Sequence, residues 1–136
     1  MNAGHARSVR EAILGWFRPV PTITASQWAV ENVVIPAPQT QSPGPFSFSG
    51  REYLRELVDF FSAPFLTDEV AVFGSQAAKT TGLMAGLSYI IANAPCPVLW
   101  VAPSRDLVRS FSKTRWQPIV RATAPLALMI PKGAKR

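Results

Sequence analysis

The stretch Phe73-Gly74-Ser75-Gln76-Ala77-Ala78-Lys79-Thr80-Thr81 decides how the rest of this chain is interpreted. It follows a β-like run at residues 69–72 and opens into a helical pattern over residues 80–94. A strand, a tight loop, a Lys-Thr pair and a helix form the layout of a phosphate-binding loop. The pattern therefore predicts a nucleoside triphosphate site. Its residues are Gly74, Ser75, Gln76, Ala77, Ala78, Lys79, Thr80 and Thr81.

The full pattern for such a loop is G-x-x-x-x-G-K-[ST], and both glycines are missing from their places here. Ala78 stands at the second glycine and Phe73 at the first, while Gly74 comes one residue late. The loop must turn backbone N–H groups toward the phosphates at the positive end of a helix. Lys79 can reach the β- and γ-phosphates, and the Thr80 hydroxyl can ligate Mg²⁺. If Ala78 needs a positive φ, the conformation costs on the order of 1 kcal/mol.

The alternative for this stretch is an ordinary helix start, with Ser75 or Gln76 near the cap and Lys79 in solvent. The flanking segments favour the phosphate site. Residues 98–102 are a continuous apolar run, typical of a strand buried on both faces of a parallel sheet. Ser104 then predicts the N-cap of a helix that continues to about Thr123, with a break at Pro118. The order strand, loop, helix, strand, helix predicts the α/β class with a parallel sheet.

The first part of the chain is predicted to be helical and proline-rich. Helices are expected over residues 6–17, from Thr24 or Ser26 to Glu31, and over residues 51–62. Residues 34–50 are rich in Pro, Ser, Gln and Gly, which suits a linker, although two phenylalanines within it indicate that part of it packs. We divide the chain into an N-terminal helical and Pro-rich segment, residues 1–50, and a partial P-loop domain, residues 51–136.

The amino-acid composition excludes a disordered protein and indicates the kind of partner. The chain has 136 residues, of which 48% are hydrophobic and 16% charged, so it is too apolar for a disordered protein. The formal net charge of +6 suits a polyanionic partner such as DNA, RNA or a nucleotide. The single cysteine, Cys96, is expected to be a reduced and packed thiol in a cytoplasmic protein. No apolar run is long enough to predict a membrane span.

Several segments together resemble the N-terminal part of lambda-type phage terminase large subunits, the ATP-driven motors that package viral DNA. The resemblance covers nearly the whole chain. The order and spacing of the resembling segments are more specific to the family than any single segment. Its segments are Trp16-Phe17-Arg18-Pro19, Ser26-Gln27-Trp28-Ala29, Val34-Ile35-Pro36, Gly44-Pro45-Phe46, residues 51–56, Ser75-Gln76-Ala77-Ala78-Lys79-Thr80, residues 98–107, Phe111-Ser112 and Pro118-Ile119.

The resemblance implies N-terminal helices followed by the first βαβα unit of a RecA-like P-loop ATPase domain, with an incomplete parallel sheet. It assigns Lys79 to the phosphates of ATP, Thr80 to Mg²⁺ and Gln76 to the Walker A loop. Arg105 or Arg109 is expected to approach nucleotide or DNA phosphates. Implied partners are ATP, DNA and, in a complete motor, the terminase small subunit or portal. The implied location is the cytoplasm of a bacterial host, without membrane attachment.

The chain departs from the family pattern in two ways. Ala78 replaces the loop glycine, and no apolar strand ending in Asp-Glu follows the loop, since Asp106 is the only acidic residue after Glu69. The general base and the acidic Mg²⁺ partner of an ATPase are therefore missing. We expect a truncated or split gene product, or a prophage remnant, that has no catalytic residue and neither ATPase nor nuclease activity on its own.

Two other readings stay open at this stage. A non-enzymatic basic module could bind DNA or a packaging partner. Its cationic residues would be Arg7, Arg10, Arg18, Arg105, Arg109 and Arg115. A complete small kinase is the third reading, and the missing acidic catalytic residue argues against it.

Overall fold

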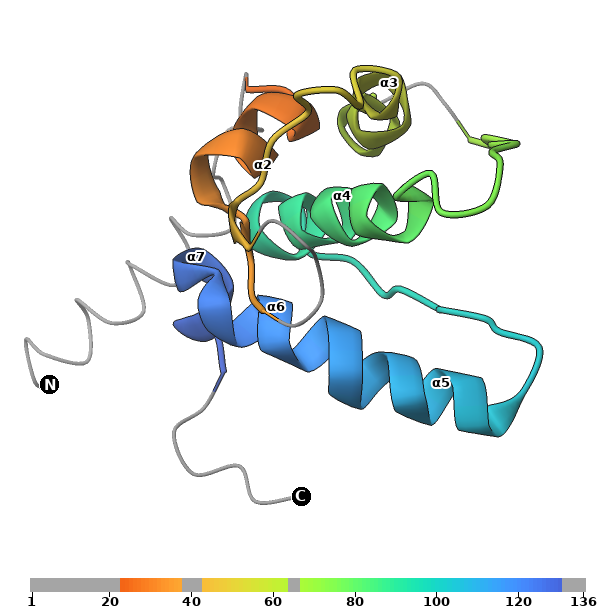
Figure 1. The fold of residues 1–136 in the computed structure, drawn as a ribbon. Helices are drawn as coiled ribbons and strands as arrows, with labels where there is room; N and C mark the ends of the chain where they lie inside the picture. The colour runs from red at the N-terminus through yellow and green to blue at the C-terminus, as the bar shows by residue number, and fades with distance from the viewer. Residues whose placement is uncertain (1–22, 38–42, 64–66, 131–136) are drawn as a thin grey trace, which may run out of the picture.

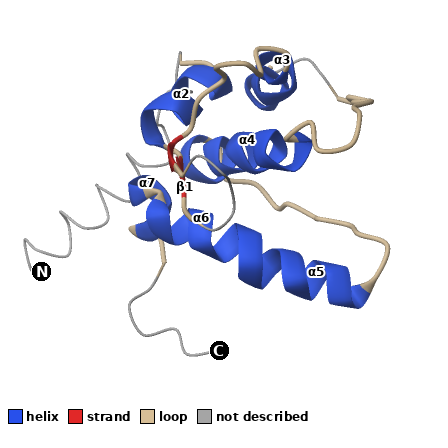
Figure 2. Ribbon diagram, viewed as in Figure 1, coloured by secondary structure: helices blue, strands red, loops and turns tan. Residues whose placement is uncertain are grey.

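The computed structural model describes residues 23–37, 43–63 and 67–130. These residues are mostly helical, with one two-stranded antiparallel sheet among them (Figure 2). The elements in chain order are α2 (Ala25–Asn32), β1 (Val34–Ile35), β2 (Gly44–Pro45), α3 (Leu54–Asp59), the 3₁₀ turn η1 (Phe60–Ser62), α4 (Lys79–Asn93), α5 (Arg105–Phe111), the π-helical η2 (Ser112–Trp116), α6 (Gln117–Ala122) and α7 (Ala124–Ala127).

Helix α4 lies at the centre of the fold. Helices α2 and α3 pack on one side of it, and the run from α5 to α7 lies on the other (Figure 1). Residues 84–89 of α4 are all buried, because the helix is covered over most of its circumference. The core joins Trp28 of α2, Leu54 of α3, Met84 of α4 and Ile119 of α6. The predicted helix at residues 80–94 is confirmed, and it supplies most of this core.

Helix α2 begins where the sequence predicts. The Thr24 hydroxyl accepts a hydrogen bond from the Gln27 N–H, and the Gln27 side chain accepts one from the Thr24 N–H, which is a capping box. Asp59 reinforces this end, because its carboxylate accepts from the N–H and the hydroxyl of Ser26 at 2.8 and 3.0 Å. The start of α2 is therefore tied to the end of α3.

The Pro-rich stretch is partly packed. Strands β1 and β2 pair antiparallel, with Val34 opposite Pro45 and Ile35 opposite Gly44. Phe46 and Phe48, which follow β2, are only 4% and 3% exposed, and their rings contact edge to face. The prediction that the two phenylalanines pack is confirmed, and they bring residues 44–50 against the helical core.

The parallel sheet predicted from residues 69–73 and 98–102 is not seen in the part of the chain that the structure describes. Both segments are extended but unpaired, and Val70 and Leu99 are 90% and 87% exposed. A strand of a parallel sheet needs at least one neighbouring strand to pair with and helices on both faces of the sheet. Here residues 94–103 only pass between α4 and α5 (Figure 1). The α/β class is thus corrected to a mostly helical fold with a small antiparallel sheet.

The predicted helix after residue 103 is present as a run of helical elements. Ser104 is its N-cap, because the hydroxyl accepts from the Leu107 N–H at 3.3 Å. The expected break at Pro118 takes the form of the π-helical turn η2 just before it, and α6 continues after it. Helix α7 was not predicted.

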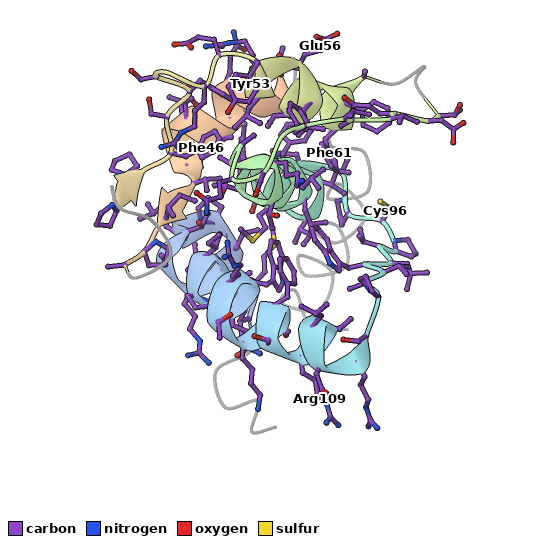
Figure 3. The ribbon with its side chains drawn as sticks, turned by 45° about the vertical axis from the view of Figure 1, so that its right-hand side comes forward. Phe46, Tyr53, Glu56, Phe61, Cys96 and Arg109 are labelled. Atoms are coloured by element: carbon purple, nitrogen blue, oxygen red, sulfur yellow. The ribbon has the colours of Figure 1, made fainter. Side chains whose placement is uncertain are left out.

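Three further predictions concern Cys96, the helix at residues 6–17 and the absence of a membrane span. The predicted packing of Cys96 is wrong, because this thiol is exposed (Figure 3). The helix predicted at residues 6–17 and the segment around Trp16 lie outside the described residues. Among the helices of the described ranges, none is long and apolar enough to cross a membrane.

Candidate functional site

The loop before α4 is a tight turn in which two residues take the left-handed conformation. Ala78, the residue just before α4, has φ 52° and ψ 16°, which is the left-handed conformation. Gln76 is left-handed as well, with φ 58°. Gly74 has no positive φ and sits in open space, so the freedom of this glycine is not used for the turn. Left-handed residues separated by one position curl the chain around the end of the helix.

Contacts on both sides hold this loop. The Ala78 carbonyl accepts from the N–H groups of Thr81 and Gly82 at 2.9 and 3.1 Å, which starts the hydrogen bonds of α4. The Tyr53 hydroxyl donates to the Ala77 carbonyl at 3.2 Å, and the Tyr53 ring lies 5.8 Å from that of Phe73. Tyr53 was missed from the sequence, because only the tertiary fold brings the segment before α3 to the loop.

The start of α4 is not capped by a side chain. Its N-cap residue is Ala78, which has no side-chain hydrogen bond to offer, so the cap at Ser75 or Gln76 is not seen, whereas Lys79 is exposed as the alternative expects. The first N–H groups of a helix have no partners inside the helix, and the dipole makes this end positive. Lys79 and Thr80 are the first two residues of α4, with Lys79 exposed and Thr80 half-buried. The arrangement suits an anion.

A cavity of about 850 Å³ opens beside this helix start. Three segments that are distant in the sequence line it, namely residues near the β1–β2 pair, the loop with the first turn of α4, and one residue of η2. The lining residues are Ile35, Pro45, Phe46, Ser47, Ser49, Arg51, Gln76, Ala77, Ala78, Lys79, Thr80, Thr81 and Arg115.

The cavity therefore brings together six of the eight predicted site residues, from Gln76 to Thr81. Gly74 and Ser75 lie on the same loop but do not line it. Its described lining carries three cationic side chains, several hydroxyls and no carboxylate, so its chemistry suits a polyanion. Arg51 and Arg115 were not predicted for this site, and no local sequence signal joins them to Lys79.

The two other arginines considered for phosphate contact lie elsewhere. Arg105 and Arg109 are exposed on α5 and do not line the cavity. Figure 3 shows Arg109 directed away from the body of the molecule. Of the arginines on the run from α5 to α6, only Arg115 reaches the cavity within the described residues.

A second cavity, of about 650 Å³, is acidic instead. Carboxyl groups from just before α3, from α3 itself and from the extended segment after it line this cavity: Glu52, Glu56, Asp59, Asp68 and Glu69. Partial burial, with the nearby Glu56 charge, raises the pKa of Glu69. Hydrogen bonds from backbone N–H groups, including that of Gly50 at 2.9 Å, lower the pKa of Glu52. These carboxyls do not form a group suited to a metal ion in the described part of the chain.

Comparison with known proteins identifies the family. No curated protein and no solved structure matches the chain. The family model described as phage terminase large subunit gpA, ATPase domain, matches residues 40–136. The match spans β2, α3, the Lys79 loop, α4 and all the helices after it, and it includes most of the cavity lining. The chain therefore belongs to the phage terminase large subunit gpA family, through the ATPase domain of that family.

Proposed function

We propose that this chain binds Mg²⁺-ATP in the cavity beside α4, as the nucleotide-binding part of a viral DNA-packaging ATPase. Membership of the family implies nucleotide binding and partners in the DNA-packaging machinery. The proposed loop comprises Gly74, Ser75, Gln76, Ala77, Ala78, Lys79, Thr80 and Thr81. The proposed domain division stays at residue 50, and the proposed location stays the cytoplasm of a bacterial host.

One observation carries this proposal. The left-handed Ala78 leads directly into the 15-residue helix α4, with Lys79 at its first position and the loop lining a cationic cavity. The free N–H groups and the dipole at this helix end attract phosphate, and Lys79 adds a full charge. Thr80 has the hydroxyl that would ligate Mg²⁺. When bound, the metal ion would neutralise charge on the β- and γ-phosphates.

We propose further that binding is not followed by efficient hydrolysis in this chain alone. The water-activating base and the acidic metal ligand of P-loop ATPases are carboxylates or their equivalents. The described lining of the cavity supplies none, and Asp106, the only acidic residue after Glu69, lies exposed in the first turn of α5. Phosphates would be held, but no described group would act on the attacking water.

Titration of the purified chain with a fluorescent ATP analogue and Mg²⁺ tests binding. We expect saturable binding that falls about tenfold or more in Lys79→Ala, because one strong charge-assisted contact is lost. Lys113→Ala is the matched control, since it removes an exposed lysine that does not line the cavity. Equal binding by Lys79→Ala and the parent chain would refute the proposed site.

A phosphate-release assay tests the second part. We expect no turnover above background with Mg²⁺-ATP. Robust turnover that disappears in Lys79→Ala would show that the chain holds a complete catalytic site after all.

A basic module that binds DNA is the second candidate. The exposed Arg105 and Arg109 on α5, one helical turn apart, favour it. Arg7, Arg10 and Arg18 lie outside the described residues. Salt-sensitive DNA binding without any nucleotide affinity would support this candidate over the first.

A further inference from the structure

The cavity beside Lys79 receives a second strong cation from a distant element. Arg115 belongs to η2, which comes after α4, the extended segment 94–103 and α5 in the chain, yet it lines the same cavity as Lys79 and Thr80. We propose that Arg115 is a phosphate-binding residue of this site and contacts the phosphate chain of the nucleotide directly. This inference rests on the proposed function.

The π-helical turn explains how Arg115 comes to this position. In η2 the Gln117 N–H donates to the Ser112 carbonyl, five residues back, so the turn holds one residue more than an α-turn. Pro118 is the cause, because proline has no N–H for the Thr114 carbonyl and its ring clashes with that carbonyl in a regular helix. The wider turn changes the direction in which the residues around it project.

The neighbours of Arg115 fix the orientation of this turn. Phe111 and Trp116 are partly buried against the core, and Phe111 stacks on Trp100 with ring centroids 4.4 Å apart. Ile119, at the next turn, is fully buried. With these apolar side chains held inward, the exposed Arg115 is left at the rim of the cavity rather than in the core.

The negative charge of a triphosphate is larger than the single positive charge of Lys79 can neutralise. A triphosphate carries several negative charges, and the described lining offers three cations, namely Arg51, Lys79 and Arg115. Arginine presents a planar fork of donors that matches two phosphate oxygens, whereas lysine acts as a point charge. Arg115 is also on a different element from the loop, so a nucleotide that contacts both would join α4 to η2.

The test compares ligands and variants on the whole chain. A fluorescent ATP analogue is displaced by ATP and, separately, by inorganic triphosphate, in the parent chain and in Arg115→Ala, Lys113→Ala and Lys79→Ala. We expect Arg115→Ala to weaken both competitors about tenfold, as loss of one charged hydrogen-bonded contact does. Lys113→Ala, on the same turn but off the cavity, is expected to stay within about twofold, since surface charges act weakly at a distance.

The outcomes separate the two proposals. If Arg115→Ala binds both competitors like the parent chain while Lys79→Ala does not, the role of Arg115 is refuted and the nucleotide site stands. If Arg115→Ala and Lys113→Ala weaken binding equally, the effect is one of net charge and the direct contact is refuted. If the parent chain does not bind the nucleotide, both proposals fail. If Arg115→Ala lowers the melting temperature, the same displacement titrations are repeated with Arg115→Gln, which keeps most of the side-chain length. The same outcomes then support or refute the direct contact.

Discussion

Two left-handed residues, Gln76 and Ala78, shape the end of the proposed phosphate loop, and neither is glycine. A Cβ in this conformation meets the following carbonyl, which costs roughly 1–2 kcal/mol for a residue other than glycine. Hydrogen bonds to two neighbouring carbonyls help to hold Ala78 in this strained conformation. Its carbonyl is bound by two N–H groups of α4, and the preceding carbonyl is held by Tyr53. A tertiary contact thus helps to keep a residue in a conformation that its own side chain disfavours.

Ala78→Gly is therefore expected to stabilise the chain. The substitution removes the strain, while the extra freedom of glycine in the unfolded chain offsets part of the gain, so we expect a net increase of about 0.5–1 kcal/mol in the free energy of unfolding. The same change should tighten nucleotide binding, because the loop no longer resists its bound shape. Urea denaturation and titration with the ATP analogue measure the two effects.

Ala77→Gly is the matched control for this prediction. Ala77 is the neighbouring alanine of the same loop and has no positive φ. Glycine there adds freedom to the unfolded chain and relieves no strain, so the free energy of unfolding should fall by up to about 1 kcal/mol. If both substitutions changed stability in the same direction, the left-handed geometry at Ala78 would not be the cause.

The residues of the proposed site differ in how far the sequence could predict them. Lys79, Thr80 and the loop were predictable because they are adjacent in the chain and share a known spacing. Tyr53, Arg51 and Arg115 reach the site through the packing of α3 and η2, which leaves no local pattern. The amino-acid sequence therefore predicts only the part of the proposed site that lies at the N-terminal end of α4.

Helix α4 contains two glycines that look alike in the sequence but have different surroundings. At Gly86 an added Cβ would overlap the Phe61 ring of η1, so the ring lies directly against the helix backbone. At Gly82 the nearest atom to an added Cβ would be Leu57 Cδ2 at 3.4 Å, an ordinary contact. Phe61 and Gly86 thus form a close packing point between η1 and α4, and Gly82 does not.

Alanine at these two positions should act in opposite directions. Gly82→Ala is expected to raise the free energy of unfolding by about 0.5–1 kcal/mol, because alanine favours the helix. Gly86→Ala gains the same propensity but must displace the Phe61 ring, for which overpacking costs about 1–3 kcal/mol. Thermal and urea unfolding of both variants give the comparison. A stabilising Gly86→Ala would mean that Phe61 does not pack against α4 in solution.

The acidic cavity between α3 and the extended segment gives a pH-dependent prediction. The pKa of Glu69 is raised above the ordinary value of 4.5, so the folded chain holds this proton more tightly than the unfolded chain. Stability from this group is then fully present below pH 4.5 and is lost as the pH rises through the raised pKa. Glu69→Gln is neutral at every pH and should be more stable than the parent chain at pH 7, with the advantage vanishing below pH 4.5.

Melting temperatures of both chains across pH 3.5 to 7 provide the measurement for Glu69. Glu52→Gln is the control of opposite sign, because backbone N–H groups lower the pKa of Glu52 and stabilise its charged form. That variant should be less stable than the parent chain at pH 7. An advantage of Glu69→Gln that is independent of pH would point to the amide itself and not to the charge.

Most of the described helices were predictable and the pairing of the strands was not, for a physical reason. Thr24 and Ser104 cap their helices through hydrogen bonds to residues only three positions away, so the relevant contacts are local. The runs at residues 69–73 and 98–102 have the composition of strands, but strands form only against neighbours that supply the other half of each hydrogen bond. In the described residues the two runs have no such neighbours.

The fold as a whole leaves much apolar surface uncovered. Val70, Val72, Leu99 and Val101 are each between 78% and 90% exposed, and all lie on the two extended segments. Extended backbone with exposed apolar side chains and unpaired N–H and C=O groups readily pairs with another chain. The core around α4 does not depend on these side chains, because it is built from α2, α3, α4 and α6.

We therefore expect the purified chain to self-associate as its concentration rises. The double substitution Val72→Thr with Leu99→Thr is expected to reduce this association. The melting temperature of the double variant should stay close to that of the parent chain, because the replaced side chains bury little surface. Sedimentation velocity over a range of concentrations measures the association.

Val58→Thr is the contrasting control for stability, since Val58 is fully buried and a hydroxyl there costs about 1–3 kcal/mol. A parent chain that sediments as a monomer throughout, or a double variant that melts as early as Val58→Thr, would show that these segments are covered in solution.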